Sequence, residues 1–153
     1  GARGLAHTGN TEKADRLGEL GLDALVADDP GAVAQAVADL GVSVVLDPLG
    51  GDYVAALLPV VAPAARVVTY GILAGRTTTL DLGTLYGKGI SIVGTSGGTT
   101  PPEDANAALE QALAAVLDGS VVVDHEVLPL AEGTAAFERL AERSVNGKLL
   151  LGM

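Results

Sequence analysis

The sequence predicts an α/β domain in which a parallel β-sheet carries helices on both faces. Strand-like segments alternate with helical segments of about ten residues or more, as in right-handed βαβ units. The runs VSVVL and ISIV are apolar almost throughout, which is typical of parallel strands buried on both sides. No linker or change of composition divides the chain, so we expect a single domain over residues 1–153.

The expected strands and helices follow one another in a regular order. Strands are predicted where apolar and β-branched residues cluster, at 3–8, 23–27, 42–47, 65–72, 90–98, 121–128 and 148–151. Helices are predicted between most of them, at 11–20, 31–40, 52–62, from Thr100 past Val116, and at 132–143. A polar loop with three threonines is expected after the strand at 65–72.

Local signals mark the ends of several helices. Gly21 stands where a helix C′ glycine would, and Asp29 with Pro30 forms an acidic N-cap followed by proline. Thr100 and Glu103 have the spacing of a capping box. The helix after it has one apolar face, typical of a half-buried helix, formed by Ala105, Ala108, Leu109, Ala112, Leu113 and Val116.

Composition excludes several classes of function. A net charge of −10 and an aromatic content of 3% argue against nucleic-acid binding, which needs a basic face and stacking side chains. Cysteine is absent and the two histidines, His7 and His125, are far apart, so no metal site is expected. No apolar run is long enough for a membrane span and no leader opens the chain. We therefore expect a soluble, cytoplasmic protein with no membrane partner.

Candidate ligand-binding residues follow the predicted strands. In an open parallel sheet, ligands bind outside the carboxyl ends of the strands, and here those ends carry small or hydroxylated residues. The segments are Thr8–Asn10, Asp47–Gly51, Tyr70–Ile72 and Gly94–Gly98. Each segment alone could be a simple turn, but their recurrence along one edge favours a ligand.

The end of the first strand carries the most specific signal. Sheets that bind NAD place an acid there for the ribose hydroxyls, whereas this chain has AHTGNTEK. Thr8, Asn10 and Lys13 suit a 2′-phosphate, which a carboxylate would repel. The alternative is that Asn10 or Thr11 only caps the helix and Lys13 is solvated.

Four segments, HTGNTEKADRLGELGLDALV, VSVVLDPLGGDYVAALLPVVAPAARVVTYGILAG, SIVGTS and NGKLLLG, together resemble the medium-chain dehydrogenase/reductase superfamily. The likeness runs in order along the whole chain and is strongest to its quinone oxidoreductase-like, NADPH-dependent branch. It implies a Rossmann-like sheet and a cofactor site that receives NADPH. The residues it implies for that site are Thr8, Gly9, Asn10, Lys13, Asp47, Pro48, Leu49, Gly50, Gly51, Gly71, Ile72, Thr95, Ser96, Asn146 and Lys148.

The chain also departs from that family. No glycine-rich turn of the type G-x-G-x-x-G precedes Arg3, so the family's first strand and the turn that binds pyrophosphate are lacking. The preceding GroES-like catalytic domain is absent too. Because the missing strand is central in the family, the remaining strands are expected to leave a gap or to rearrange. Ala64-Ala65-Arg66 replaces the family's common glycines before a later strand.

Three hypotheses follow from the resemblance. The first is the cofactor-binding part of an enzyme that transfers hydride from NADPH to a quinone or an activated alkene or carbonyl, the small-molecule substrate being bound by the full-length parent. This chain alone would then be inactive and bind NADPH weakly or not at all. The second is a non-catalytic module that forms a homodimer through the strand at 90–95. The third is a piece of a zinc alcohol dehydrogenase. No catalytic residue is assigned. His125 is expected at the surface or on an edge strand, and Tyr53 either in packing or as a partly exposed neighbour of a helix cap.

Overall fold

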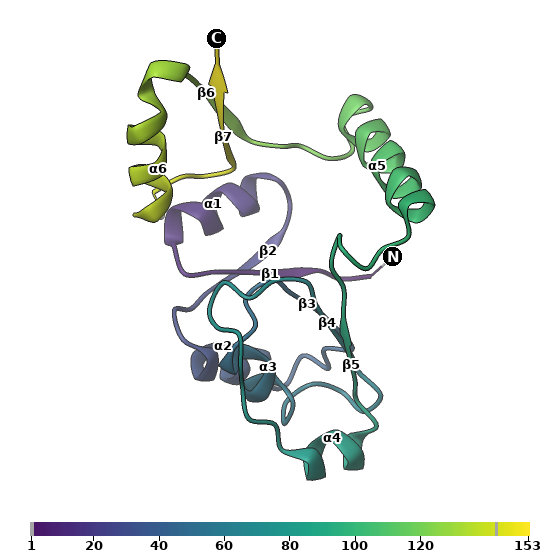
Figure 1. Cartoon of the computed structure of the whole chain (residues 1–153). Coiled ribbons are helices and arrows are strands. Elements are labelled where there is room, and N and C mark those ends of the chain that lie inside the picture. The colour runs from purple at the N-terminus through teal and green to yellow at the C-terminus, as the bar shows by residue number, and fades with distance from the viewer. Residues whose placement is uncertain (1, 143) are drawn as a thin grey trace. The chain divides into compact units, whose positions relative to one another are not determined.

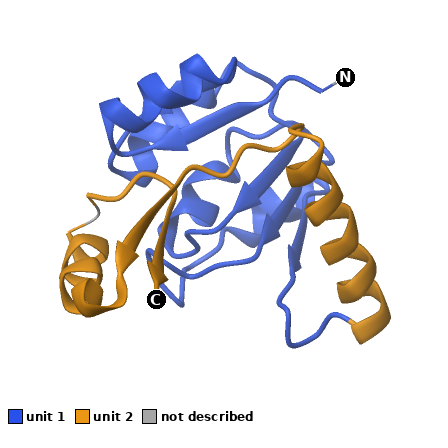
Figure 2. Cartoon of the chain, turned by 90° about the horizontal axis from the view of Figure 1, so that it is seen from above, with its two compact units in different colours: residues 1–100 blue, residues 101–153 orange. Residues whose placement is uncertain are grey.

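A computed structural model describes residues 2–142 and 144–153 and shows a Rossmann-like alternation of strands and helices (Figure 1). The chain divides into two compact units, residues 1–100 and 101–153, which are coloured separately in Figure 2. The first unit contains β1 (Leu5–Thr8), α1 (Thr11–Glu19), β2 (Asp23–Val26), α2 (Pro30–Val37), β3 (Val44–Asp47), α3 (Asp52–Leu57), β4 (Arg66–Thr69), α4 (Leu82–Lys88) and β5 (Ser91–Gly94). The single domain expected over 1–153 stays a prediction.

The strands of the first unit form two separate sheets. β1 pairs with β2, and β4 lies between β3 and β5 in a three-stranded sheet. All of these pairs are parallel, as the sequence predicts. In the part of the chain that the structure describes, no strand pairing joins β1 to β3. β1 and β3 therefore belong to separate sheets, and whether they leave a gap or rearrange stays a prediction.

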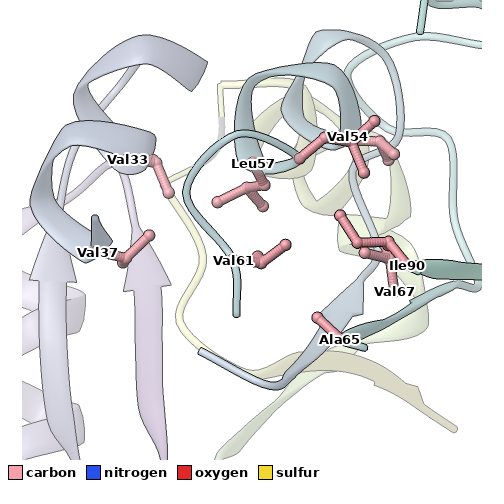
Figure 3. Packing of buried hydrophobic residues seen from close by; sticks show 9 residues of the cluster. Val33, Val37, Val54, Leu57, Val61, Ala65, Val67 and Ile90 are labelled. Atoms are coloured by element: carbon pink, nitrogen blue, oxygen red, sulfur yellow. The ribbon is translucent and has the colours of Figure 1, made fainter. Parts of the chain in front are cut away.

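The core of the first unit is built from valine, leucine and alanine side chains. Val33 and Val37 come from α2, and Val54 and Leu57 from α3 (Figure 3). They form one cluster with Val67 of β4, which is completely buried. Side chains of β2 and of the segment after it, Leu25 and Ala27, pack against the same cluster. The two sheets therefore share a side-chain core although no backbone ladder connects them.

Two of the predicted helix signals are confirmed. The Asp29 carboxylate accepts a 2.9 Å hydrogen bond from the Ala32 N–H, and Pro30 begins α2, as expected for an acidic N-cap followed by proline. Gly21 has a φ of 77° just beyond the end of α1. A glycine adopts this left-handed conformation without steric cost, so the chain reverses there into β2.

Two local predictions are wrong and one helix was not predicted. The polar loop with its three threonines is present after β4, but it leads into an unpredicted helix, α4, which begins after Asp81; that side chain accepts from the Gly83 N–H and the Thr84 hydroxyl. Thr100 forms no capping box, because its hydroxyl donates to the Ser96 carbonyl and Pro101 is the N-cap of α5 without a side-chain bond. β6 begins at His125, so residues 121–124 lie outside the strand.

The second unit contains α5 (Pro102–Leu117), β6 (His125–Pro129), η1 (Leu130–Glu132), α6 (Gly133–Ala141) and β7 (Lys148–Gly152). β6 and β7 pair in parallel, and a bidentate ion pair between Arg139 of α6 and Glu126 of β6 links helix to strand. None of the residues of α5 is buried, although a half-buried helix was expected. Over the described residues, no helix has both the length and the apolar character needed to span a bilayer.

Candidate functional site

The carboxyl ends of the three strands β3, β4 and β5 lie at one level. Asp47, Thr69 and Gly94 end these strands and are aligned with one another across the sheet. The backbone pairing continues one residue further: the Tyr70 N–H donates to the Asp47 carbonyl over 2.9 Å and the Thr95 N–H to the Thr69 carbonyl over 3.0 Å. The predicted segments after β3, β4 and β5 therefore emerge together along one edge of this sheet.

Asp47 organises the turn that follows β3. Its side chain is 4% exposed, and one carboxylate oxygen accepts hydrogen bonds from the Leu49 and Gly50 N–H groups, both over 2.9 Å. The other oxygen accepts from the Thr69 hydroxyl over 3.0 Å. An aspartate that bonds the backbone two and three residues further on forms a tight turn at the strand end. Residues 47–51 are thus held by one side chain that is itself fully bonded.

The turn after β3 is joined by its backbone to the segment after β4. The Ala74 N–H donates to the Leu49 carbonyl over 2.8 Å, and the Gly51 N–H to the Gly75 carbonyl over 3.1 Å. Gly50 has a φ of 64°, and a Cβ placed on it would lie 2.8 Å from the Gly75 oxygen. Only glycine meets both demands, because the left-handed backbone and the neighbouring carbonyl each exclude a side chain. The two segments form one double loop.

The segment after β1 is organised by Asn10. Its side-chain oxygen accepts a hydrogen bond from the Lys13 N–H over 3.2 Å, which makes Asn10 the N-cap of α1. The Asn10 N–H in turn donates to the Thr8 hydroxyl over 3.2 Å. The capping role considered for Asn10 is thus present. Gly9 is exposed between these two residues, and the Lys13 side chain lies one turn into the helix.

A contact between two rings connects this segment to the double loop. The rings of His7 and Tyr53 lie 5.7 Å apart between centroids, and Tyr53 lies in the first turn of α3, two residues after Gly51. The His7 Nε2 atom is 2.9 Å from the Ala27 carbonyl, so we assign the ring proton to that nitrogen. The carboxyl ends of β1 and β3 are therefore close, and the packing role expected for Tyr53 is confirmed.

Of the remaining predicted residues of the first unit, Ile72, Thr95 and Ser96 are exposed at the same edge, and Gly71 is half-buried. Ile72 is half exposed, at 51%, and follows Gly71 after β4. Thr95 and Ser96 follow β5, and the Ser96 carbonyl accepts hydrogen bonds from the hydroxyls of Thr99 and Thr100. A Cβ built on Gly94 would meet no atom within 4 Å, so the backbone there is open to a ligand.

Asn146 and Lys148 lie in the second unit. Asn146 precedes β7, and Lys148 is the first residue of this strand. Gly147 between them has a φ of 80° and lies against the Asp124 backbone, and the Lys148 N–H donates to the Asp124 carbonyl over 2.9 Å. These contacts fix the entry to β7. The predicted cofactor role of Asn146 and Lys148 stays a prediction.

Sequence reasoning missed three residues of this site. Thr69 holds Asp47, Gly75 lies against Gly50, and His7 connects two strand ends. The partner of each residue is at least 20 residues away in the sequence. Thr69 and Asp47, for example, are separated by 22 positions. Only the alignment of Asp47 with Thr69 in adjacent parallel strands could have indicated the first of them.

The residues at this edge fit part of a dinucleotide. Gly50 and Gly51 are buried and pack against backbone, so the glycine backbone open to a ligand is that of Gly9 and Gly94. Together with hydroxyl, amide and ammonium groups at the end of β1, it suits ribose and phosphate. The residues at this edge do not fit zinc. Within residues 2–142 and 144–153, no group of three or more His, Cys, Asp or Glu side chains is placed to hold a metal ion, so we derive no zinc step from this chain.

Comparison with known proteins places these features in context. The family model described as zinc-binding dehydrogenase matches residues 1–115. Quinone oxidoreductase-like protein 2 of Bos taurus is 28% identical over an alignment of 160 residues, gaps included, which covers 99% of this chain and 46% of that protein. The crystal structure of AibC is 29% identical with a TM-score of 0.83, over 100% of this chain and 43% of that one.

Two solved structures with the same fold contain nicotinamide cofactors. The Bacillus subtilis protein yhfP with NAD bound is 23% identical with a TM-score of 0.72, over 97% of this chain and 46% of that one. CurA of Vibrio vulnificus in complex with NADPH is 16% identical with a TM-score of 0.76, over 99% of this chain and 50% of that one. The chain thus spans about half the length of the proteins it matches.

Proposed function

Because the chain belongs to the zinc-binding dehydrogenase family, within the medium-chain dehydrogenase/reductase superfamily, we propose that it is the cofactor-binding part of an NADPH-dependent reductase. The proposed substrate is a quinone or an activated alkene or carbonyl compound. The likeness to quinone oxidoreductase-like protein 2 supports this substrate class. The substrate would be bound by parts of the whole protein beyond the 153 residues of this chain.

The choice of NADPH depends on one observation, the residues at the end of β1. Thr8, Gly9 and Asn10 present a hydroxyl, a bare backbone and an amide, and His7 to Asn10 include no carboxylate. Lys13 adds a cation in the first turn of α1. A 2′-phosphate is favoured by such donors, whereas NAD-specific sites carry an acid at this point.

The chain's own residues would bind and orient the cofactor. Thr8, Asn10 and Lys13 would contact the adenosine side, and the double loop of residues 47–51 and 71–75 would lie along the nicotinamide side. When bound, the nicotinamide ring supplies the hydride. A loop fixed before binding lowers the entropy cost of placing that ring. No side chain of this chain is assigned a proton-transfer role.

A calorimetric titration of the chain with NADPH and with NADH tests this function. We expect weak binding, because no glycine-rich pyrophosphate turn is present in the sequence, and a preference for NADPH. Tighter binding of NADH would contradict the assignment of the cofactor. Submicromolar binding of NADPH would show that the glycine-rich turn is dispensable in this chain.

A second candidate function is association through β5. This strand pairs only with β4 among the described strands, and all four of its residues are exposed, including Val93 at 43%. An unpaired edge of this kind can pair with a second copy of the chain. Sedimentation of Val93→Lys would then show less dimer than wild type. Val116→Lys, at a residue 44% exposed on α5, is the matched control.

A further inference from the structure

Asp47 is the one charged residue found buried in the described parts of the chain, residues 2–142 and 144–153. A buried carboxylate is costly unless hydrogen bonds replace its hydration. Here three donors do so: the Leu49 N–H, the Gly50 N–H and the Thr69 hydroxyl. An apolar side chain at this position would leave the Leu49 and Gly50 N–H groups and the Thr69 hydroxyl without this acceptor, so the carboxylate is tied to the loops that follow β3 and β4.

The bonds of Asp47 all lead to the double loop. One oxygen fixes the turn at Leu49 and Gly50, and the other bonds Thr69, the last residue of β4 before the second loop begins. The carbonyl of Leu49, whose N–H bonds Asp47, accepts from the Ala74 N–H over 2.8 Å. The position of residues 71–75 therefore depends on the turn that Asp47 fixes.

We propose that Asp47 and Thr69 are a positioning pair that fixes the double loop for the nicotinamide half of the cofactor. The inference rests on the proposed function and deepens it. Neither side chain reaches solvent freely, since Asp47 is buried and Thr69 half-buried. They act through the backbone of Leu49, Gly50 and Ala74, which they hold before any ligand arrives. The hydrogen bonds that hold the segment after β1 run between Thr8, Asn10 and Lys13 and include neither member of this pair.

Thr69→Val is the variant that tests the pair. It replaces the hydroxyl by a methyl of similar size and leaves one oxygen of Asp47 without its donor. Thr69→Ser returns the hydroxyl and is the rescue variant. The matched control is Thr84→Val, because Thr84 donates to Asp81 over 2.7 Å in an equivalent aspartate–threonine pair at the N-terminus of α4.

The first measurement is amide hydrogen exchange of the free chain by NMR. We expect Thr69→Val to accelerate exchange at Leu49, Gly50 and Ala74 about tenfold, which is the usual effect of losing one hydrogen bond to a charged group. Exchange at the buried Leu58 should stay as in wild type. Thr69→Ser should return the exchange rates at Leu49, Gly50 and Ala74 to their wild-type values, and Thr84→Val should leave these rates unchanged.

The second measurement uses two half-ligands in NMR titrations that reach millimolar dissociation constants. Reduced nicotinamide mononucleotide probes the double loop, and adenosine 2′,5′-bisphosphate probes the segment after β1. We expect Thr69→Val to weaken the binding of reduced nicotinamide mononucleotide about tenfold and to leave the binding of adenosine 2′,5′-bisphosphate unchanged. General loss of the fold would weaken both, so the split between them reports positioning.

The outcomes separate the two proposals. Unchanged exchange at Leu49 and Gly50 in Thr69→Val would overturn the positioning pair. So would nicotinamide binding that Thr69→Val leaves intact, and in that case the proposed function stands. Equal loss of both half-ligands would reduce the pair to a structural role. If wild-type chain binds neither half-ligand, the proposed function fails, and the cofactor role of the pair fails with it.

Discussion

The α-carbon of Gly71 lies directly against the backbone of Pro48. A Cβ built on Gly71 would overlap the Pro48 carbonyl and approach its Cα at 3.0 Å. The first residue after β3 and the second residue after β4 are thus packed backbone to backbone, with no space for a side chain between them. This contact lies beside the Asp47–Thr69 hydrogen bond and belongs to the same double loop.

Gly71→Ala should destabilise the protein. The added methyl group meets rigid backbone, so the loops must separate, and overpacking of this kind costs about 1–3 kcal/mol. Urea unfolding of the variant and wild type measures the difference. Gly97→Ala is the control, because a Cβ there meets no atom within 4 Å, and we expect a change within about 0.5 kcal/mol. Equal stability of the two variants would contradict the packing.

Ala64→Gly should stabilise the protein. Ala64 has a φ of 59°, a left-handed conformation that costs an alanine about 1 kcal/mol and a glycine almost nothing. Its N–H donates to the Lys88 carbonyl over 2.7 Å, so the backbone is held there in the native state. Greater freedom of glycine in the unfolded chain reduces the gain. A rise in the midpoint of thermal unfolding would confirm the strain, and a fall would show that it is absent.

Lys13→Gln should reduce the preference for NADPH over NADH. If Lys13 contacts the 2′-phosphate, its removal weakens the binding of NADPH about tenfold and leaves the binding of NADH unchanged, since only NADPH carries that group. Calorimetric titration with both cofactors measures the change. Arg3→Gln removes one positive charge near the opposite end of β1, where Arg3 forms an exposed ion pair with Asp23, and serves as control. Equal weakening of both cofactors would argue against a phosphate contact.

The ion pair between Glu126 and Arg139 predicts a dependence of stability on pH. The hydrogen bond from Arg139 lowers the pKa of Glu126 below its ordinary value of 4.5. A carboxyl whose pKa is lower in the folded than in the unfolded chain stabilises the fold above pH 4.5, and this contribution disappears as the pH falls through the folded pKa. Because both side chains are exposed, the effect is small.

Carboxyl NMR titration of Glu126 in wild type and Arg139→Gln checks this sign. We expect the pKa of Glu126 to rise toward its ordinary value in the variant. Arg66→Gln, which removes the same charge from β4, should leave the pKa of Glu126 where it is in wild type. A Glu126 pKa that does not respond to Arg139→Gln would contradict the ion pair.

The sequence predicts those parts of the fold that depend on neighbouring residues. The apolar runs locate β3 and β5, and Asp29 with Pro30 locates the start of α2. Gly50 and Gly51 indicate the tight turn after β3, and both have a positive φ. In each case the signal and the structure that it specifies lie within a few residues of each other.

The rest depends on contacts that neighbouring residues do not reveal. α4 contains Gly83 and Gly87, which lower its helix propensity, and it forms with Asp81 as its N-cap and Leu85 packed against the core. Thr100 has the right spacing for a capping box, but its hydroxyl donates to the Ser96 carbonyl instead. Thr69 resembles any other strand residue until the register between β3 and β4 is known. The sequence therefore indicates which loops emerge at this edge of the sheet, but not the contacts that hold those loops in place.

The break between β1 and β3 has a consequence for how the first unit unfolds. The β1–β2 pair contains no buried residue, whereas β4 contains the fully buried Val67. Since no strand pairing in the described chain joins the two sheets, the smaller one can open without breaking a hydrogen bond of the larger. We expect β1 and β2 to detach at a lower free energy than β3, β4 and β5. We therefore expect a more stable sheet, β3–β5, and a less stable pair, β1 and β2, in the first unit. The residues expected to select the cofactor follow β1 and so belong to the less stable part.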